Sequence, residues 1–346
     1  MTKEKIFLML SDVDNTITPT SEAVKAEFSQ FAKEMKENEN VELKFCPISG
    51  RDSEHISNIM KELNKPFEKS GLPQTIEIGV SDQGGVYAFR EDPSRNRPIQ
   101  KIDETLRKDI KTTFQKADVS KYFFEELNTK VINIFTVKPE CIQNLSRKNA
   151  EAFLKEKLNL LKVYMLKHLG KKIHISEFNN SEVGVLEVVP QGIGKDIGVQ
   201  KLIERFQKKY NIVGMCYCGD HENDLKAIDY MSRLAEVEGI KINIFLPKNA
   251  KEITKSPHIR VWQDKMGDIS RGRVIRQGNF DTLKGILDAM KREYNKGNLI
   301  ENGVNWKISL DDSVIVNNNR KLLEKINKKL LDNTRKANIG NERDLI

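Results

Sequence analysis

The chain has 346 residues, of which 38% are hydrophobic and 31% charged, an ordinary globular composition with room for more than one domain. No apolar run approaches the ~18 residues that a membrane span needs, and the first apolar run is too short for the core of a signal peptide. The four cysteines lack a second ligand cluster at zinc spacing, which argues against a structural zinc site. We therefore expect a cytoplasmic protein that makes no contact with a membrane.

Strands alternate with helices over the first 90 residues. We expect strands at 6–10, 41–48 and 75–80, with helices at 21–36 and from residue 52. Such alternation is typical of a parallel sheet with helices on both faces. In such sheets the ligand lies beyond the carboxyl ends of the strands, so residues that directly follow the strands are candidates for a site.

The middle of the chain has a different order of elements, αββαββ. The expected helices are 102–116 and 142–169, and the expected strands are 122–126, 130–137, 172–177 and 183–189. This order predicts a compact α+β unit with an antiparallel sheet. After Pro190 the alternation returns, with a helix at 196–210, a strand at 212–218 and further βα pieces that include a helix at 281–292. We therefore predict one parallel-sheet domain that is interrupted by an inserted α+β domain.

The C-terminal segment is basic. Eight of the 58 Lys and Arg residues but only four of the 50 Asp and Glu residues lie in 318–346, so this segment holds +4 of the net charge of +8. A basic tail can attract nucleic acid or anionic lipid. However, leucines and isoleucines recur at helical spacing over 322–331, and no aromatic residue lies among the cations. We favour an amphipathic helix and do not expect a nucleic-acid partner.

Two acidic residues, Asp12 and Asp14, follow the first strand in the sequence DVDNT. Asp and Asn are also ordinary turn formers, so the pair taken alone is equally typical of a turn. Three other polar motifs occupy strand ends or helix starts, namely Ser49 in ISGR, Lys195 in GIGKD and Asp220 in GDHENDL. The order and placement of all four motifs favour a shared site.

These residues together have the chemistry of phosphoryl transfer. Convergent Asp12, Asp14 and Asp220 would repel one another without a cation, and hard oxygen ligands suit Mg²⁺. Lys195 and the hydroxyl of Ser49 can hold phosphate oxygens. Asp12 is then placed to attack phosphorus and form an aspartyl-phosphate, while Asp14 protonates the leaving alcohol and later activates water.

In these motifs the chain resembles the phosphatases of the haloacid dehalogenase superfamily, in the Cof-type sugar-phosphatase branch. DVDNT is similar to the first family motif DxDxT, and ISGR, GIGKD and GDHENDL are similar to the second, third and fourth. The resemblance covers the chain to about residue 292. It implies a Rossmann-like core, with the αββαββ insert as its cap domain. The corresponding boundaries are 1–88 and 188–294 for the core, 89–187 for the cap and 295–346 for a C-terminal extension.

The resemblance also implies individual roles, with Mg²⁺ as the cofactor and a small phosphorylated metabolite as the substrate. Asp12 would be nucleophile and metal ligand, and Asp14 the acid/base that also binds the metal through its carbonyl. Asp220 and Asp224 would complete the metal site, with Asp224 either in direct contact or in the outer shell. The residues that would bind the phosphoryl group or the substrate are Thr16, Ser49, Gly50, Lys195 and Asn223.

Some features depart from the family pattern or leave alternatives open. Asn15 stands where the family usually has Gly, a change that a left-handed backbone tolerates. Gly84 and Gly85 lack the GK[ST] of a phosphate loop, and we expect a hinge into the cap there. His221 lies within the fourth motif, but a solvent-facing loop histidine is the simpler interpretation. The oligomeric state is not readable from the sequence.

Two other functions remain open. Thr18-Pro19 also occurs after the first motif of phosphomannomutase-like phosphomutases, although the fourth motif here lacks the longer insertion of that family. A non-catalytic binding protein that acts through the basic tail is the third hypothesis, against which the complete set of acids argues.

Overall fold

A computed structural model gives the structure of the chain and describes residues 3–99, 103–126, 131–179, 182–220, 222–238, 242–246, 272–275 and 283–301. The described residues all belong to one compact unit within Met1–Trp306. The amphipathic helix expected at 322–331 and His221 lie outside the described residues. None of the described helices has the length and apolar character needed to span a lipid bilayer.

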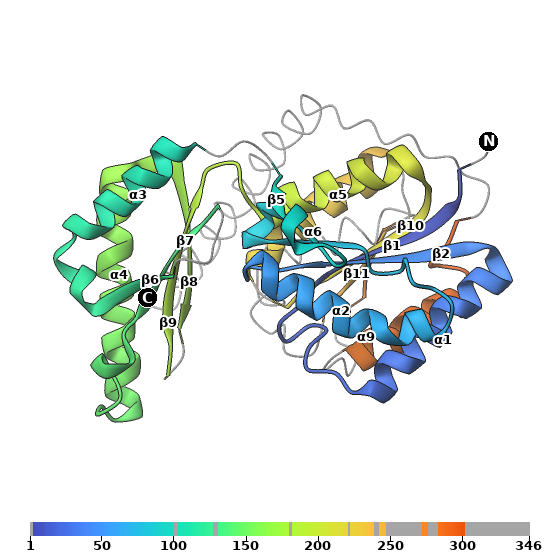
Figure 1. Cartoon of the computed structure of the whole chain (residues 1–346), viewed down its shortest axis with the longest axis horizontal. Coiled ribbons are helices and arrows are strands. Elements are labelled where there is room, and N and C mark those ends of the chain that lie inside the picture. Colours follow the sequence, from blue (N-terminus) through green and yellow to red (C-terminus); the bar gives the residue numbers. More distant parts are fainter. Residues whose placement is uncertain are drawn as a thin grey trace, which may run out of the picture. The chain divides into compact units, whose positions relative to one another are not determined.

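The larger of two sheets has eight strands in the order β12-β11-β10-β1-β2-β3-β4-β5, and β12 through β3 are parallel (Figure 1). Strands β4 and β5 are antiparallel additions at one edge. The bounds are β1 Lys5–Asp12, β2 Val41–Ile48, β3 Ile78–Ser81, β4 Val86–Phe89, β5 Arg97–Pro98, β10 Asn211–Cys218, β11 Ile242–Phe245 and β12 Gly272–Ile275.

Helices cover both faces of this sheet (Figure 1). They are α1 Glu22–Glu39, α2 Ser53–Lys69 and α9 Leu283–Asn295 on one face, with α5 Lys195–Lys209 and α6 Leu225–Glu238 on the other. Phe28, Met60 and Ile286 of the first three helices share one buried core with Phe7 and Phe45 of the sheet. Because both faces are covered, β1 and β2 are buried almost throughout, as expected for the central strands of a parallel sheet. The predicted α/β fold class is confirmed.

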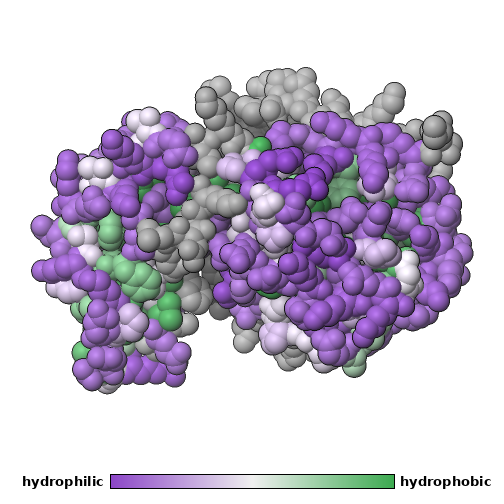
Figure 2. Space-filling view, viewed as in Figure 1, coloured by the Kyte–Doolittle hydropathy of each residue, from purple (hydrophilic) through white to green (hydrophobic). Residues whose placement is uncertain are grey.

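The smaller sheet is antiparallel, with the strand order β6-β7-β9-β8. Its strands are β6 Phe123–Glu126, β7 Asn133–Val137, β8 Ile173–Asn179 and β9 Gly184–Pro190, and its helices are α3 Glu104–Lys116 and α4 Arg147–Leu169. Leu154, Leu158 and Leu161 of α4 pack with Phe135 and Leu186 of the sheet. The elements follow the predicted αββαββ order. In Figure 2 hydrophilic residues cover most of the visible face, and apolar side chains gather over the strands of this sheet.

Two local expectations differ from the structure. The helix expected from residue 142 begins at Arg147, because Pro139–Cys141 forms a separate 3-10 turn and Ser146 caps the helix. Gly84 and Gly85 are not a hinge into the insert, because they lie in the turn between β3 and β4 of the larger sheet. The chain passes from the larger to the smaller sheet between β5 and β6 and returns to the larger sheet between β9 and β10. The exact limits of the two domains remain a prediction.

Candidate active site

Asp12 is the last residue of β1, the strand between β10 and β2 in the larger sheet. It lies opposite Ile48, the last residue of β2, so DVDNT and ISGR leave the sheet side by side. Its side chain is buried, whereas the turn that follows is partly exposed. Asn15 in that turn has a φ of 58°, in the left-handed region that asparagine tolerates well. The substitution of the usual glycine is therefore accommodated.

Lys195 begins helix α5 and lies among buried carboxylates. Its Nζ donates hydrogen bonds to Asp12 Oδ1 at 2.6 Å and to Asp224 Oδ1 at 2.7 Å. The start of this helix is held by close backbone packing, because Gly84 has a φ of +98° and a Cβ there would lie 2.0 Å from the carbonyl oxygen of Gly194. Only glycine fits such an approach, so Gly84 fixes the position from which Lys195 reaches the acids.

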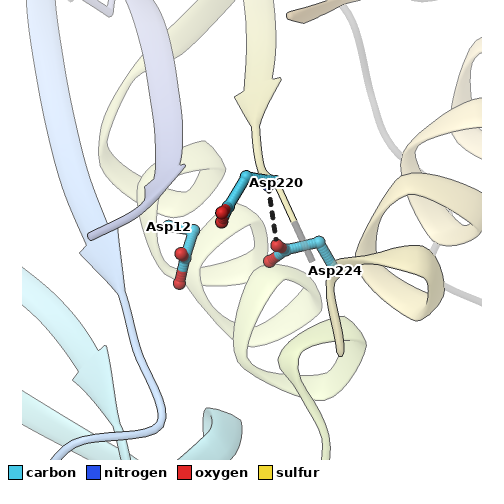
Figure 3. A group of neighbouring side chains, drawn as sticks. All are labelled: Asp12, Asp220 and Asp224. Atoms are coloured by element: carbon cyan, nitrogen blue, oxygen red, sulfur yellow. Dashed lines mark hydrogen bonds between the residues drawn. The ribbon is translucent and has the colours of Figure 1, made fainter. Parts of the chain in front are cut away.

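Asp220 and Asp224 follow β10 and face Asp12 (Figure 3). The backbone N–H of Asp220 donates to Asp224 Oδ2 at 3.1 Å, and Thr16 Oγ1 donates to Asp220 Oδ1 at 3.1 Å. One carboxylate oxygen from each of Asp12, Asp220 and Asp224 lies within 4.8 Å of the others. Three carboxylates and the single ammonium of Lys195 leave a formal charge of about −2 when all are ionised, which fits a divalent cation with oxygen ligands.

The clustered charges shift the pKa values of the group. Burial raises the pKa of Asp12 well above its ordinary value, and Asp224 adds to the rise, while Lys195 acts in the opposite direction. Burial and the neighbouring Asp224 also raise the pKa of Asp220. Burial by itself lowers the pKa of Lys195, but its two carboxylate partners outweigh this effect and raise it. The lysine thus stays charged, and the acids favour a cation or a proton between them.

Asp14 lies apart from this cluster. Its carboxylate accepts two hydrogen bonds from Arg51, from Nε at 2.7 Å and from Nη2 at 3.0 Å. Both side chains are about half exposed, at 43% for Asp14 and 52% for Arg51. This two-point contact orients the carboxylate at the rim of the site. The carboxylates of Asp12 and Asp14 therefore lie in two different environments, although only Val13 separates the two residues.

The other predicted substrate-binding residues lie at the same edge of the sheet. Ser49 is 1% exposed, and its Oγ accepts from the backbone N–H of Arg51 at 3.2 Å. At Gly50 an added Cβ would lie 2.5 Å from Gln83 Nε2, so the Gln83 side chain would have to move to make room for any larger residue. Asn223 lies in the short 3-10 helix Glu222–Asp224 and is half-buried. No contact between Asn223 and the carboxylate cluster is among the described hydrogen bonds.

Two residues of the site did not emerge from sequence reasoning. Tyr217 is fully buried in β10, and its hydroxyl donates to Asp224 Oδ1 at 2.6 Å. The sequence could have indicated Tyr217, because a tyrosine inside a buried strand needs a polar partner and GDHENDL begins two residues later. Arg51 stood within ISGR, but its pairing with Asp14 depends on how two loops meet in space.

The chain belongs to the haloacid dehalogenase-like hydrolase family, because the model of that family matches residues 9–238, which is more than half of the chain. This membership confirms the predicted superfamily and the prediction of a hydrolytic enzyme. The match ends before the last described helix and the C-terminal segment.

Several solved structures show distant likeness. The C-terminal domain of the trehalose-6-phosphate phosphatase from C. albicans is 13% identical over 70% of this chain and 83% of its own, with a TM-score of 0.43. A sugar phosphatase of haloacid dehalogenase subclass IIB is 14% identical over 82% and 98%, with a TM-score of 0.44. A haloacid dehalogenase-like hydrolase from Bacillus subtilis is 16% identical over 84% and 91%, with a TM-score of 0.35. At these scores we draw no inference from them, and no curated protein matches the chain.

Proposed function

We propose that this hydrolase is a Mg²⁺-dependent phosphatase that cleaves a small phosphate monoester, with sugar phosphates as the substrate class. The observation that carries the proposal is the cluster of Asp12, Asp220 and Asp224 around the ammonium of Lys195. Family membership supplies the hydrolytic class, and the cluster supplies groups suited to a dianionic phosphoryl group.

In this proposal Asp12 is the nucleophile. One of its carboxylate oxygens attacks phosphorus, the bond from phosphorus to the leaving oxygen breaks, and an aspartyl-phosphate forms. Lys195 contacts Asp12 directly and can transfer one of its hydrogen bonds to a phosphoryl oxygen. The buried Ser49 hydroxyl and the backbone of Gly50 would hold other phosphoryl oxygens, and Thr16 would support Asp220 through the hydrogen bond that joins them.

Asp14 would deliver a proton to the leaving alkoxide and then accept a proton from the water that cleaves the aspartyl-phosphate. Both carboxylate oxygens of Asp14 are engaged by Arg51, so substrate binding has to exchange at least one of these bonds for the leaving group. Arg51 would then be free to contact the substrate. The ion pair thus supports a role for Arg51 in positioning Asp14.

The donor set of the site fits Mg²⁺. Asp12 and Asp220 would be its carboxylate ligands, Asp14 would contribute its main-chain carbonyl, and Asp224 would bind directly or through water. When bound, the ion would offset the charge of the acids and of the phosphoryl group. Tyr217 and Lys195 both hold Asp224 and so limit the freedom of this carboxylate.

The smaller sheet with α3 and α4 would form a cap domain over residues 89–187, with the core at 1–88 and 188–294. Such a cap would enclose a small phosphorylated metabolite rather than a folded macromolecule, and Asn223 would contact it. All four cysteines are free thiols, which supports a reducing compartment and hence the cytoplasm. We propose neither a membrane nor a nucleic-acid partner.

The decisive experiment is a screen of the full chain against phosphorylated sugars, with MgCl₂ or with EDTA, in which released phosphate and any isomerised sugar phosphate are both measured. We expect phosphate release with Mg²⁺ that EDTA abolishes. An isomerised product without phosphate release would instead indicate a phosphomutase. Asp14→Asn tests the assignment more directly, because hydrolysis of p-nitrophenyl phosphate that is unchanged in this variant would contradict a catalytic role for Asp14.

A further inference from the structure

A cavity lies at the opposite end of the larger sheet from the acids. It has a volume of about 680 Å³ and is bordered by the start of β3, the end of β4 and the C-terminal turn of α5. Lys195 begins α5 and Lys209 ends it, so at 1.5 Å per residue the cavity lies about 20 Å from the carboxylate cluster. The lining residues that matter here are Phe89, Arg95, Arg205, Lys208, Lys209 and Tyr210.

Three guanidinium groups converge on the ring of Phe89. The Cζ atoms of Arg95, Arg97 and Arg205 lie 4.9, 5.5 and 5.7 Å from the ring centroid. Each contact is favourable by itself as a cation–π interaction. Together, however, they bring three like charges around one buried ring, and the mutual repulsion falls when an anion binds among them.

The part of the chain that the structure describes gives these three arginines no salt bridge. Two acidic residues of the cavity have other partners. Glu91 pairs with the buried Arg90, and Asp92 accepts hydrogen bonds from Ser94. Glu77 is the remaining carboxylate of the lining, and no salt bridge to it is among those described. The guanidinium of Arg90 also contacts Glu68 and the carbonyl of Pro73, so Arg90 forms part of the wall rather than a free cation.

A structural role accounts for some of the cations but not for all of them. Lys208 and Lys209 stand in the last turn of α5, where cations offset the negative end of the helix dipole. Lys209 also lies 4.8 Å from the centroid of the Tyr210 ring. Arg95 ends the short 3-10 helix Pro93–Arg95 and Arg97 begins β5, so the dipole of α5 does not explain why these two arginines share the Phe89 ring with Arg205.

We propose that this cavity binds a small anion with two or more phosphate groups, at a site separate from the proposed catalytic centre. Arg95 and Arg205 would form bidentate hydrogen bonds to phosphate oxygens, which planar guanidinium groups favour. Lys208 extends the positive rim of the cavity. The site uses none of the residues proposed for catalysis, so it does not depend on the proposed function.

The test is isothermal titration of the full chain with tripolyphosphate in EDTA, compared with the double variant Arg95→Gln/Arg205→Gln. Because both side chains are exposed, we expect the variant to fold, and we expect its affinity to fall at least tenfold. The charge-matched control is Lys108→Gln/Lys155→Gln, which removes two exposed cations from α3 and α4 and should change affinity less than twofold. Hydrolysis of p-nitrophenyl phosphate by the arginine variant should stay within twofold of the unmodified chain.

Three outcomes would overturn the proposal. The first is no binding by the unmodified chain, and the second is equal weakening in both double variants, which would indicate only long-range attraction. The third is full affinity in the arginine variant, which would place the bound anion elsewhere on the chain. A chain without phosphatase activity that still binds tripolyphosphate through Arg95 and Arg205 would contradict the proposed function alone.

Discussion

The two sheets of this protein bury their strands in different ways. Seven consecutive residues of β1, from Ile6 to Asp12, are buried, whereas the first four residues of β9 alternate between buried and half-buried. The difference follows from the helices. They cover both faces of the larger sheet, whereas the smaller sheet packs against α3 and α4. A strand covered on both faces has little freedom, so groups at its end are held firmly. The larger sheet is therefore suited to holding catalytic groups in fixed positions, and the smaller sheet tolerates substitutions on its less covered face.

The largest expected difference between the two regions concerns a single carboxylate. Asp12→Asn should lower the rate of p-nitrophenyl phosphate hydrolysis by at least about 10³-fold, because an amide is a far weaker nucleophile. The control is Asp118→Asn at an exposed turn beside the smaller sheet, which should leave the rate within about twofold. Equal rates for both variants would contradict the assignment of Asp12, at the end of β1, as the nucleophile.

The next effect concerns the buried ion pairs at the start of α5. Lys195→Met leaves Asp12 and Asp224 without their cation and should lower the free energy of unfolding in EDTA by about 3–5 kcal/mol. Lys201→Met on the same helix removes only the contact with Glu204 and should cost less than about 1 kcal/mol. Urea unfolding measures the free energy of unfolding of both variants. Similar losses in the two variants would show that burial of the carboxylate cluster does not determine how much its ion pairs stabilise the fold.

The smaller sheet should respond mainly through its core. Leu154→Ala removes a side chain that is 0% exposed in α4 and should cost about 2–5 kcal/mol. Leu166→Ala on the same helix, at 41% exposure, should cost well under about 1 kcal/mol. Thermal or urea unfolding gives the two values. If the two variants unfold alike, α4 does not pack against the sheet as described.

The smallest expected effect is the pH dependence of metal stabilisation. In the metal-free protein the raised pKa values of Asp12 and Asp220 mean that the folded state keeps protons which the unfolded state releases above about pH 4. Their contribution to stability therefore falls as the pH rises from that value through the raised pKa values of the folded state. Mg²⁺ needs the ionised carboxylates and removes this loss, so its benefit should grow with pH.

Thermal unfolding with MgCl₂ and with EDTA at about pH 5.5 and about pH 7.5 measures this difference. We expect Mg²⁺ to raise Tm by about 3 °C more at the higher pH. In Asp220→Asn the dependence on pH should be weaker, because one of the two shifted carboxylates is absent. A Mg²⁺ effect that is the same at both pH values would contradict binding by these acids.

Much of this arrangement was predictable from the sequence, for physical reasons that act locally. The alternation of short apolar runs with helical stretches predicted buried parallel strands before DVDNT and GDHENDL, because strands covered on both faces are apolar without a strict alternation. Strand ends of a parallel sheet meet at one edge, so Asp12 and Asp220 were expected to be close. The start of α4 was missed because a proline-initiated turn and a serine cap compete with the apolar period that extends upstream.

The sequence by itself determined the order of elements, the apolar core and the set of chemical groups at the sheet edge. Only the tertiary structure decided how those groups pair: Lys195 bonds to both Asp12 and Asp224, and Arg51 holds Asp14 outside their cluster. It also gathered Arg95, Arg97 and Arg205 around one phenylalanine. Periodicity and propensity act over a few residues, whereas these contacts join segments far apart in the chain and depend on how those segments pack together.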